Sequence, residues 1–327
     1  FQKKILKKNV YFFFFFIIIF TCNYFFGVNK INKTKYSFND NFIVKIISPS
    51  FSLADYQNID EKNKIHRLIK ISNPEKNEKT LFIWPEGIFY ESNLQSIRKY
   101  ESLFKDSFSE KHLIILGINN YVSTNNMDDK KYFNSLVLLN NKLEILSLYN
   151  KIKLVPFGEF LPLENIFSKF GFKKITAGYN SFSSGDKRNI INLGSKFENK
   201  LILPIICYEI IYPAKIKTKN QLPDLLVNIS EDAWFGQSIG PFQHFTKAIY
   251  RSVEEGVFTA RSANKGISAF VDPSGKIVKS LKTGESGNIQ LNFPYFNGST
   301  LFSIYGNKIF LFIIFLYIFL ILILRKL

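Results

Sequence analysis

Short apolar runs that end in polar residues constrain the fold of this chain more than any other feature. They are rich in β-branched and aromatic residues and cover residues 43–47, 80–84, 113–116, 135–139, 201–206 and 225–229. Amphipathic stretches with helical periodicity lie between them, near residues 60–71, 91–108 and 242–255. The alternation predicts an α/β fold in which helices cover the faces of buried strands. No repeat or Gly/Ser-rich linker divides this region, so we expect one domain.

The high positive charge of the chain does not by itself indicate a nucleic-acid partner. The 327 residues are enough for a large core, and the formal net charge is +17. The lysines are dispersed among Asn, Ile and Phe, without a basic-aromatic cluster or a nucleic-acid motif. We therefore expect no nucleic-acid partner. An AT-rich genome would explain the charge, as would a basic surface that lies against anionic lipid headgroups.

Two long apolar runs lie near the ends of the chain, at residues 10–27 and 309–324. The first follows four lysines, and the second is closed by Arg325 and Lys326. Both approach the roughly 20 apolar residues that a transmembrane helix needs, and snorkelling Lys and Arg side chains extend them. Because the positive flanks lie at the outer ends, both termini are predicted to be cytoplasmic and the domain between them to lie across the bilayer.

The first apolar run has two competing interpretations. A secretory signal would need a small-x-small cleavage site, and none follows the run. A lipoprotein signal would end at Cys22, but Phe20 and Thr21 are poor residues before such a cysteine. We interpret the run as a membrane helix. Since the chain begins with Phe1 rather than Met, we expect further apolar helices upstream.

These patterns predict four segments. Residues 1–30 form a basic stub and a transmembrane helix, and residues 31–42 form a linker. Residues 43–295 form the catalytic domain. Residues 296–327 form a second linker and a C-terminal transmembrane helix.

Cys207 is the first candidate functional residue. It ends the apolar run at 201–206 and is followed at once by Tyr208 and Glu209. A thiol at the end of a buried strand is a common position for a nucleophile, although a lone cysteine is more often an inert core residue. The other cysteine, Cys22, lies in the first apolar run, so a structural disulfide is not expected.

Other polar residues also follow predicted strands. Glu86 comes after Trp-Pro and is a candidate general base, or else a helix cap or a solvated acid. Residues 149–162 carry Lys151, Lys153 and Glu159. A lysine near an apolar turn is either an ordinary surface residue or a source of positive charge for an oxyanion. Residues 228–236 form another polar strand end.

Several chemistries lack their signatures in the chain. Ser238 matches a nucleophile-elbow pattern, but no acid lies between it and the following histidine, His244. No supporting motif surrounds the histidines, which are His66, His112 and His244. Cys/His ligand spacing and a Gly-rich phosphate loop are also absent, so we expect no metal and no cofactor.

Three of these residues, taken in order, resemble a known family. Glu86 after Trp-Pro, Lys151 before Val-Pro-Phe-Gly-Glu, and Cys207 in Ile-Cys-Tyr-Glu are similar to the Glu-Lys-Cys triad of the nitrilase superfamily. The segments that more narrowly resemble the apolipoprotein N-acyltransferase family are 149–162, 206–210, 232–244 and 261–269. The resemblance covers roughly residues 43–293 and both flanking helices. The Ser238 match falls in one of the family's loops.

The resemblance implies a nitrilase-like α-β-β-α sandwich and a ping-pong acyl transfer. Glu86 would accept the thiol proton, Cys207 would be the nucleophile that forms a thioester, and Lys151 would stabilise the oxyanion. The supporting residues would be Glu159 near the lysine, and Tyr208 and Glu209, which would shape the pocket beside the thiol. Lys153 has no role in the family.

The implied partners are lipids. The acyl donor would be a membrane phospholipid, and the acceptor would be the amine of a diacylglyceryl-cysteine on an apolipoprotein. The protein would be a monomer in the lipid bilayer of the bacterial inner membrane, with several spans and a periplasmic catalytic domain. Two flanking membrane helices suit lipid substrates, whereas a soluble amidase of the same superfamily would not need them.

The chain also departs from the family. It would contain only the last helix of a membrane domain, residues 48–53 lack a usual Gln-containing turn, and Glu231 stands where a neutral residue is more usual. Two other hypotheses stay open: a membrane-anchored carbon–nitrogen hydrolase with the same triad, and an inactive binding protein. Whether an amine or water resolves the thioester separates the first two.

Overall fold

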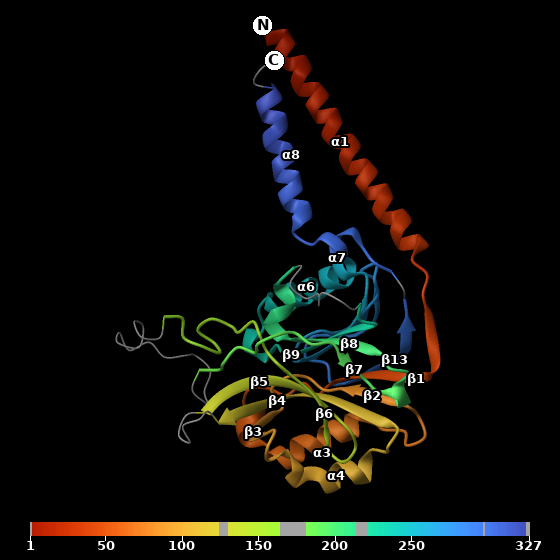
Figure 1. Ribbon diagram of the computed structural model, residues 1–327, viewed down its shortest axis with the longest axis vertical. Helices are drawn as coiled ribbons and strands as arrows, with labels where there is room; N and C mark the ends of the chain where they lie inside the picture. Colours follow the sequence, from red (N-terminus) through yellow and green to blue (C-terminus); the bar gives the residue numbers. More distant parts are fainter. Residues whose placement is uncertain (1, 124–129, 164–180, 214–221, 297, 325–327) are drawn as a thin grey trace. The chain divides into compact units, whose positions relative to one another are not determined.

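The computed structural model describes residues 2–123, 130–163, 181–213, 222–296 and 298–324 (Figure 1). The chain divides into two compact units, residues 1–36 and residues 37–327. Arg325 and Lys326, which were expected to close the C-terminal helix, lie outside the described residues.

The first unit consists of the helix α1, Gln2–Lys33. Its segment Phe13–Lys33 is long and apolar enough to cross a membrane. The mean hydropathy is 1.6, and none of the segment is buried inside the protein. Among the described residues it is the one helix that meets both conditions. The sequence of α1 contains no proline that would interrupt a helix. The helix continues to Lys33, beyond the expected boundary at residue 30.

The second unit contains the strands and most of the helices. The strands are β1 (Ser37–Ser48), β2 (Thr80–Ile83), β3 (Phe89–Asn93), β4 (His112–Ser123), β5 (Lys130–Leu139), β6 (Ile145–Asn150), β7 (Ile191–Asn192), β8 (Leu201–Ile206), β9 (Leu225–Glu231), β10 (Phe258–Asn264), β11 (Ser268–Val271), β12 (Ile277–Leu281) and β13 (Gly287–Tyr295). The α-helices are α2 (Asp55–Asn58), α3 (Glu61–Ser72), α4 (Glu101–Ser107), α6 (Gly240–Glu255), α7 (Leu301–Tyr305) and α8 (Lys308–Leu324). The short 3-10 helices are η1 (Ile97–Tyr100), η3 (Ser195–Phe197), η4 (Cys207–Ile211) and η5 (Ala233–Phe235).

The strands form two sheets within the described residues. In the first sheet the order is β13-β1-β2-β4-β5-β6, with β3 paired to β4; in the second it is β12-β11-β10-β9-β8-β7. The centre of each sheet is parallel, through β1-β2-β4 and β8-β9-β10. The sheets contact each other through β1 against β10 and β11, and through β5 against β8.

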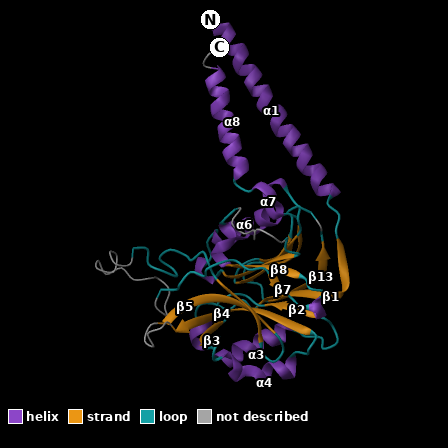
Figure 2. Ribbon diagram, in the orientation of Figure 1, coloured by secondary structure: helices purple, strands orange, loops and turns teal. Residues whose placement is uncertain are grey.

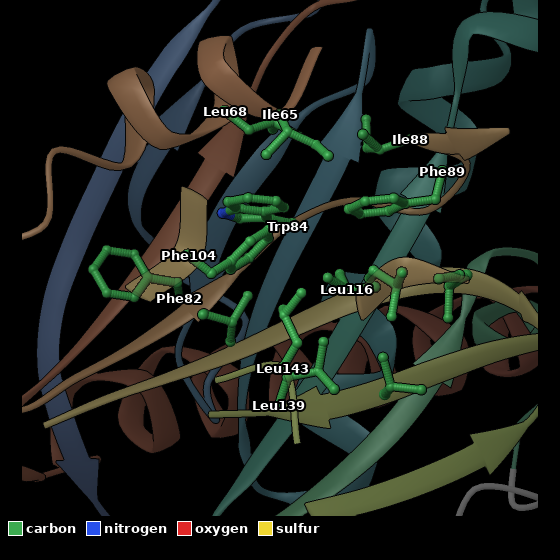
Figure 3. Close-up of a cluster of buried hydrophobic side chains, with 14 of the residues drawn as sticks. Ile65, Leu68, Phe82, Trp84, Ile88, Phe89, Phe104, Leu116, Leu139 and Leu143 are labelled. Atoms are coloured by element: carbon green, nitrogen blue, oxygen red, sulfur yellow. The ribbon is translucent and has the colours of Figure 1, made fainter. Parts of the chain in front are cut away.

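Helices α3 and α4 cover the outer face of the first sheet (Figure 2). Asp60 caps α3 by accepting a 2.8 Å hydrogen bond from the Asn63 N–H, and Asn73 ends the helix in the left-handed conformation. The helix buries Ile65 and Leu68 against the sheet, beside the aromatic side chain of Trp84 (Figure 3). Burial of these side chains stabilises the layer by about 1.5–3 kcal/mol each.

Helix α6 covers the second sheet. Pro241 lies in its first turn, and Gly256 ends it with a φ of +67°. Phe245 and Ala248 face a core formed with β8, β9 and β11. The resulting order of helix, sheet, sheet and helix is the predicted α-β-β-α sandwich.

Three expectations about the elements need correction. The linker at residues 31–42 reduces to residues 34–36, because α1 reaches Lys33 and the start of β1 pairs with β13. The helix expected over residues 91–108 is split, since its first residues belong to β3 and only η1 and α4 are helical. The linker at the C-terminal end contains α7.

The C-terminal apolar run does form a helix, α8, of 17 residues. At 1.5 Å per residue it is roughly 26 Å long, less than the roughly 30 Å of a hydrocarbon core. The described part of α8 is therefore too short to meet the spanning criterion. The prediction of two flanking transmembrane helices is not confirmed.

Candidate active site

The candidate site lies where several strands end. Glu86 follows β2, and Cys207 directly follows β8. Because parallel strands end at the same edge of a sheet, residues after β8, β9 and β10 gather there. The β5–β6 pairing, which matches Ser135 with Asn150, brings Asn134 beside Lys151, whose N–H donates a 2.8 Å hydrogen bond to the Asn134 carbonyl.

Contacts with α3 and β4 hold the loop that carries Glu86 in place. The indole N–H of Trp84 donates a 3.0 Å hydrogen bond to the hydroxyl of Ser72 at the end of α3. Gly117 on β4 lies directly under the loop, and a Cβ at this position would be only 2.8 Å from the Cα of Glu86. Glycine is therefore required at position 117 for Glu86 to take its observed place, where it is 7% exposed.

Glu86, Lys151 and Glu159 form a buried charged cluster. The Lys151 Nζ lies 3.0 Å from Glu159 Oε1 and 3.4 Å from Glu86 Oε1. The side-chain amide of Asn134 donates to the same two oxygens, over 2.7 Å and 2.6 Å. Val155 completes the cluster, since its N–H donates a 2.9 Å hydrogen bond to Glu159 Oε2. Glu159 is thus near the lysine, as expected.

Charge keeps Lys151 protonated despite its burial. Burial alone would lower the pKa of Lys151, but the carboxylates of Glu159 and Glu86 outweigh it and raise the pKa above its ordinary value. A fixed positive charge in a buried site can stabilise an oxyanion.

Cys207 is partly buried and has an unusual backbone conformation. Its φ is +45°, and it starts η4 immediately after the β8 strand. A side chain other than Gly pays roughly 1–2 kcal/mol for this left-handed conformation, so the surrounding contacts must hold it. Burial raises the pKa of the Cys207 thiol, and the charge of Glu86 adds to the rise while Lys151 opposes it. The resting group is therefore a thiol, which needs a base to become a nucleophile.

Glu209 connects the turn that carries Cys207 to the segment that carries Lys151. Its Oε2 accepts a 2.9 Å hydrogen bond from the Ile206 N–H. Its Oε1 accepts hydrogen bonds from the Tyr149 hydroxyl at 2.6 Å and from the Ile152 N–H at 2.9 Å. Arg188 forms an ion pair with this carboxylate, with 3.0 Å between its NH2 atom and Glu209 Oε1. One buried carboxylate thereby binds Ile206, which precedes Cys207, and also Tyr149 and Ile152, which flank Lys151.

Tyr208 and Lys153 make contacts of other kinds. The ring of Tyr208 packs edge-on against Tyr212, with 5.4 Å between the centroids. The main-chain N–H of Lys153 donates a 3.2 Å hydrogen bond to Glu209, which is a structural contact.

Sequence reasoning missed a second buried cluster behind Cys207. Asp232 contacts Arg261 NH2 at 2.7 Å, His244 Nδ1 at 3.0 Å and the Ser230 hydroxyl at 2.7 Å. The other nitrogen of His244, Nε2, lies 3.2 Å from the carbonyl oxygen of Cys207. This histidine thus contacts the main chain of Cys207, in contrast to a Cys-His pair that would use the sulfur.

Asn134 was also missed. Asn134 lies in β5, directly before the apolar run at residues 135–139 that predicted this strand. Its polar side chain at the edge of that run is the signal that could have identified it. Asp232 had a stronger signal, because residues 228–236 were recognised as a polar strand end.

Two other observations bear on the site. Within the described residues, no three His, Cys, Asp or Glu side chains are grouped so that they could hold a metal ion. A surface cavity of about 390 Å³ lies elsewhere, lined by residues that include Glu110, Asn141 and Lys196, and it contains none of the candidate residues.

A model of the carbon–nitrogen hydrolase family matches residues 64–293, which is more than half of the chain and contains Glu86, Lys151 and Cys207. The chain belongs to this family. The match confirms the predicted relationship to the nitrilase superfamily, and it starts inside α3 and ends inside β13.

Among curated proteins, the chain is similar to several that are named apolipoprotein N-acyltransferase. The one from Rhodopseudomonas palustris is 41% identical over 50% of this chain and 30% of its own length. The one from Rickettsia prowazekii is 34% identical over 88% of this chain and 57% of its own length. The chain therefore spans from about a third to somewhat more than half of these relatives.

Solved structures support the fold. An amidase mutant from Nesterenkonia sp. AN1, with the acetamide moiety of fluoroacetamide added covalently at its active-site cysteine, aligns with a TM-score of 0.51 and 14% identity. The alignment covers 80% of this chain and 94% of the amidase. A nitrilase-superfamily protein of Saccharomyces cerevisiae aligns with a TM-score of 0.50 and 19% identity, over 77% and 89% of the two chains. At these identities the likeness establishes a nitrilase-like fold.

Proposed function

We propose that this chain transfers an acyl chain from a membrane phospholipid to the N-terminal amine of a diacylglyceryl-cysteine on an apolipoprotein. The observation that carries the proposal is the buried cluster in which Lys151 lies between the carboxylates of Glu86 and Glu159, and which the Glu209 carboxylate connects to the turn that carries Cys207. The names of the curated relatives support acyl transfer over hydrolysis.

In the first half of the reaction, Glu86 accepts the proton of the Cys207 thiol, and the thiolate attacks the ester carbonyl carbon of the phospholipid. The carbonyl oxygen becomes an oxyanion, which the ammonium of Lys151 stabilises. The bond between the carbonyl carbon and the ester oxygen then breaks. The leaving oxygen takes the proton back from Glu86, so that a lysophospholipid and a Cys207 thioester remain.

In the second half, the free amine of the lipoprotein cysteine attacks the thioester. Glu86 accepts a proton from the amine, and Lys151 again faces the oxyanion. The carbon–sulfur bond breaks as an amide forms, and the proton returns from Glu86 to Cys207. The cycle is ping-pong and leaves the protein unchanged.

The membrane enters the proposal through α1. We place Phe13–Lys33 across the bacterial inner membrane, because it is apolar and its side chains are not buried by the protein. The lysines before the apolar run favour a cytoplasmic N-terminus, which would leave the catalytic domain on the periplasmic side. We further propose that α8 reaches the bilayer as a second span and that the chain acts as a monomer.

One experiment separates this activity from its alternatives. The purified chain in phospholipid vesicles is incubated with a synthetic diacylated lipopeptide, and mass spectrometry follows both the lipopeptide and Cys207. An amide-linked third acyl chain, absent with Cys207→Ala, is the expected result.

Three other results would contradict the proposal. Released fatty acid with an unmodified lipopeptide means that water resolves the thioester, as in a carbon–nitrogen hydrolase. The absence of any acyl adduct on Cys207 means that the chain is an inactive binding protein. An unchanged product with Cys207→Ala would remove the mechanism altogether.

A further inference from the structure

Glu231 is a buried carboxyl that the proposed reaction does not use. It is the last residue of β9 and is 6% exposed. Its Oε1 accepts a 2.9 Å hydrogen bond from the Ala233 N–H, and its Oε2 accepts one from the Tyr56 hydroxyl. The side-chain amide of Asn264 lies 2.9 Å from both oxygens. The carboxyl therefore joins the ends of β9 and β10 to α2 and η5.

The partners of Glu231 differ from those of the other site acids. Glu86 and Glu159 both lie beside the ammonium of Lys151, whereas no Lys or Arg nitrogen in the described part of the chain lies within 4.0 Å of the Glu231 carboxyl. Burial accordingly raises the pKa of Glu231 to about 8, and the charge of Glu86 contributes to the rise. The hydrogen bonds that Glu231 accepts oppose it.

Glu231 also touches the Glu86 loop in two ways. Its main-chain N–H donates a 3.1 Å hydrogen bond to Glu86 Oε2, on the side opposite to the contacts with Lys151 and Asn134 at Oε1. Its carboxyl lies against Gly87, where a Cβ would be 3.1 Å from Oε2 of Glu231. The position of Glu231 thus determines both the orientation of the Glu86 carboxylate and the room available to the residue after it.

We propose that Glu231 is a positioning residue for Glu86. Its side chain anchors the end of β9 to Tyr56 and Asn264, and this keeps its main-chain N–H aimed at Glu86. The N–H stabilises the ionised form of Glu86 that accepts the proton of Cys207.

The inference rests on the proposed role of Glu86 as the base for Cys207. It is tested with the full chain in detergent micelles and a p-nitrophenyl ester of a fatty acid, whose release of p-nitrophenolate reports acylation of Cys207. Glu231→Ala removes the anchor, and Glu231→Gln keeps a side chain of the same shape. Glu78→Gln, at an exposed position, serves as the matched control.

Glu231→Ala should lower the maximal acylation rate about tenfold or more while KM stays unchanged, because a small displacement of a base is costly and Glu231 does not touch the substrate. Glu231→Gln should recover most of that loss, because the amide keeps the shape of the side chain and an acceptor oxygen for Tyr56 and Asn264. Where Glu231→Ala does not fold, Tyr56→Phe removes one anchor and should slow acylation about threefold.

Two results would overturn the inference: a native acylation rate with Glu231→Ala, or a loss with Glu231→Gln as large as that with Ala. These results are distinct from failure of the acyltransferase. Acylation of Cys207 without transfer to a lipopeptide would contradict only the proposed function. Absence of acylation in the native chain would contradict both.

Discussion

Gly117 lies so close to Glu86 that a Cβ on Gly117 would be 2.8 Å from the Glu86 Cα. Gly117→Ala should therefore displace the Glu86 loop and lower the rate of Cys207 acylation about tenfold or more, with a loss of about 1–3 kcal/mol of stability from overpacking. The matched control is Gly287→Ala in β13, where a Cβ meets its nearest atom at 3.7 Å. Equal acylation rates for the two variants would show that the contact does not position Glu86.

Lys151 should be a large contributor to stability as well as to the chemistry. Lys151→Met leaves Glu86 and Glu159 buried without their cation and should lower the free energy of unfolding by about 3–5 kcal/mol. Urea unfolding at neutral pH measures this loss. Adding Glu159→Gln should restore part of it, because one of the two uncompensated charges is then removed.

Lys153→Met is the control for Lys151, because the contact of Lys153 with Glu209 uses only its main chain. It should change stability by less than about 1 kcal/mol. If both lysine variants unfold at the same urea concentration, the buried ion pairs do not hold the site together.

Glu86→Gln should separate thiol acidity from catalysis. The charge of Glu86 raises the pKa of Cys207, so its removal should move the pH profile of iodoacetamide alkylation to lower pH. The same variant lacks the base and should acylate Cys207 roughly 10²–10⁴-fold more slowly with an ester substrate. A Cys22→Ser background confines alkylation to Cys207. An alkylation profile that moves to higher pH would contradict the assignment of Glu86.

Asp232 should make the fold sensitive to acid. Burial alone would raise the pKa of Asp232, but Arg261 and His244 outweigh it and lower the pKa from 3.8 to about 2. A depressed pKa adds stability above the unfolded value of 3.8, and this stability is lost as the pH falls toward 2. The shift corresponds to roughly 2 kcal/mol.

Unfolding of the native chain and of Asp232→Asn across pH 2–6 measures this contribution. The difference in free energy between the two should be constant above about pH 5 and should shrink between about pH 4 and pH 2. Asp40→Asn, at an exposed position, controls for the loss of a surface charge. A difference that is equally large at pH 2 and pH 5 would contradict the depressed pKa.

The sequence predicted all but one of the strands at the centres of the two sheets, because they are buried and read as apolar runs, as β8 and β9 do. It did not predict β10. That strand is fully buried too, but it carries Arg261, Ser262 and Asn264. These side chains donate hydrogen bonds to Asp232, the Ile47 carbonyl and the Phe51 carbonyl. Polar burial of this kind depends on partners far away in the sequence.

The candidate site shows the same division. Glu86 and Cys207 were predictable because each follows an apolar run directly. Asn134 required the antiparallel register of β5 and β6, and the role of Glu231 required knowledge of its partners. A motif identifies reacting groups, whereas the groups that orient them are determined by strand register and loop packing.

The Glu209 carboxylate holds the turn around Cys207 and the segment after Lys151 at the same time. A displacement of one must therefore carry the other with it, and the thiol and the ammonium form a single rigid unit. Exposed loop residues such as Phe157, Leu163, Trp234 and Ile239 lie outside this unit. Substitutions at these positions should therefore leave the spacing of Cys207 and Lys151 unchanged.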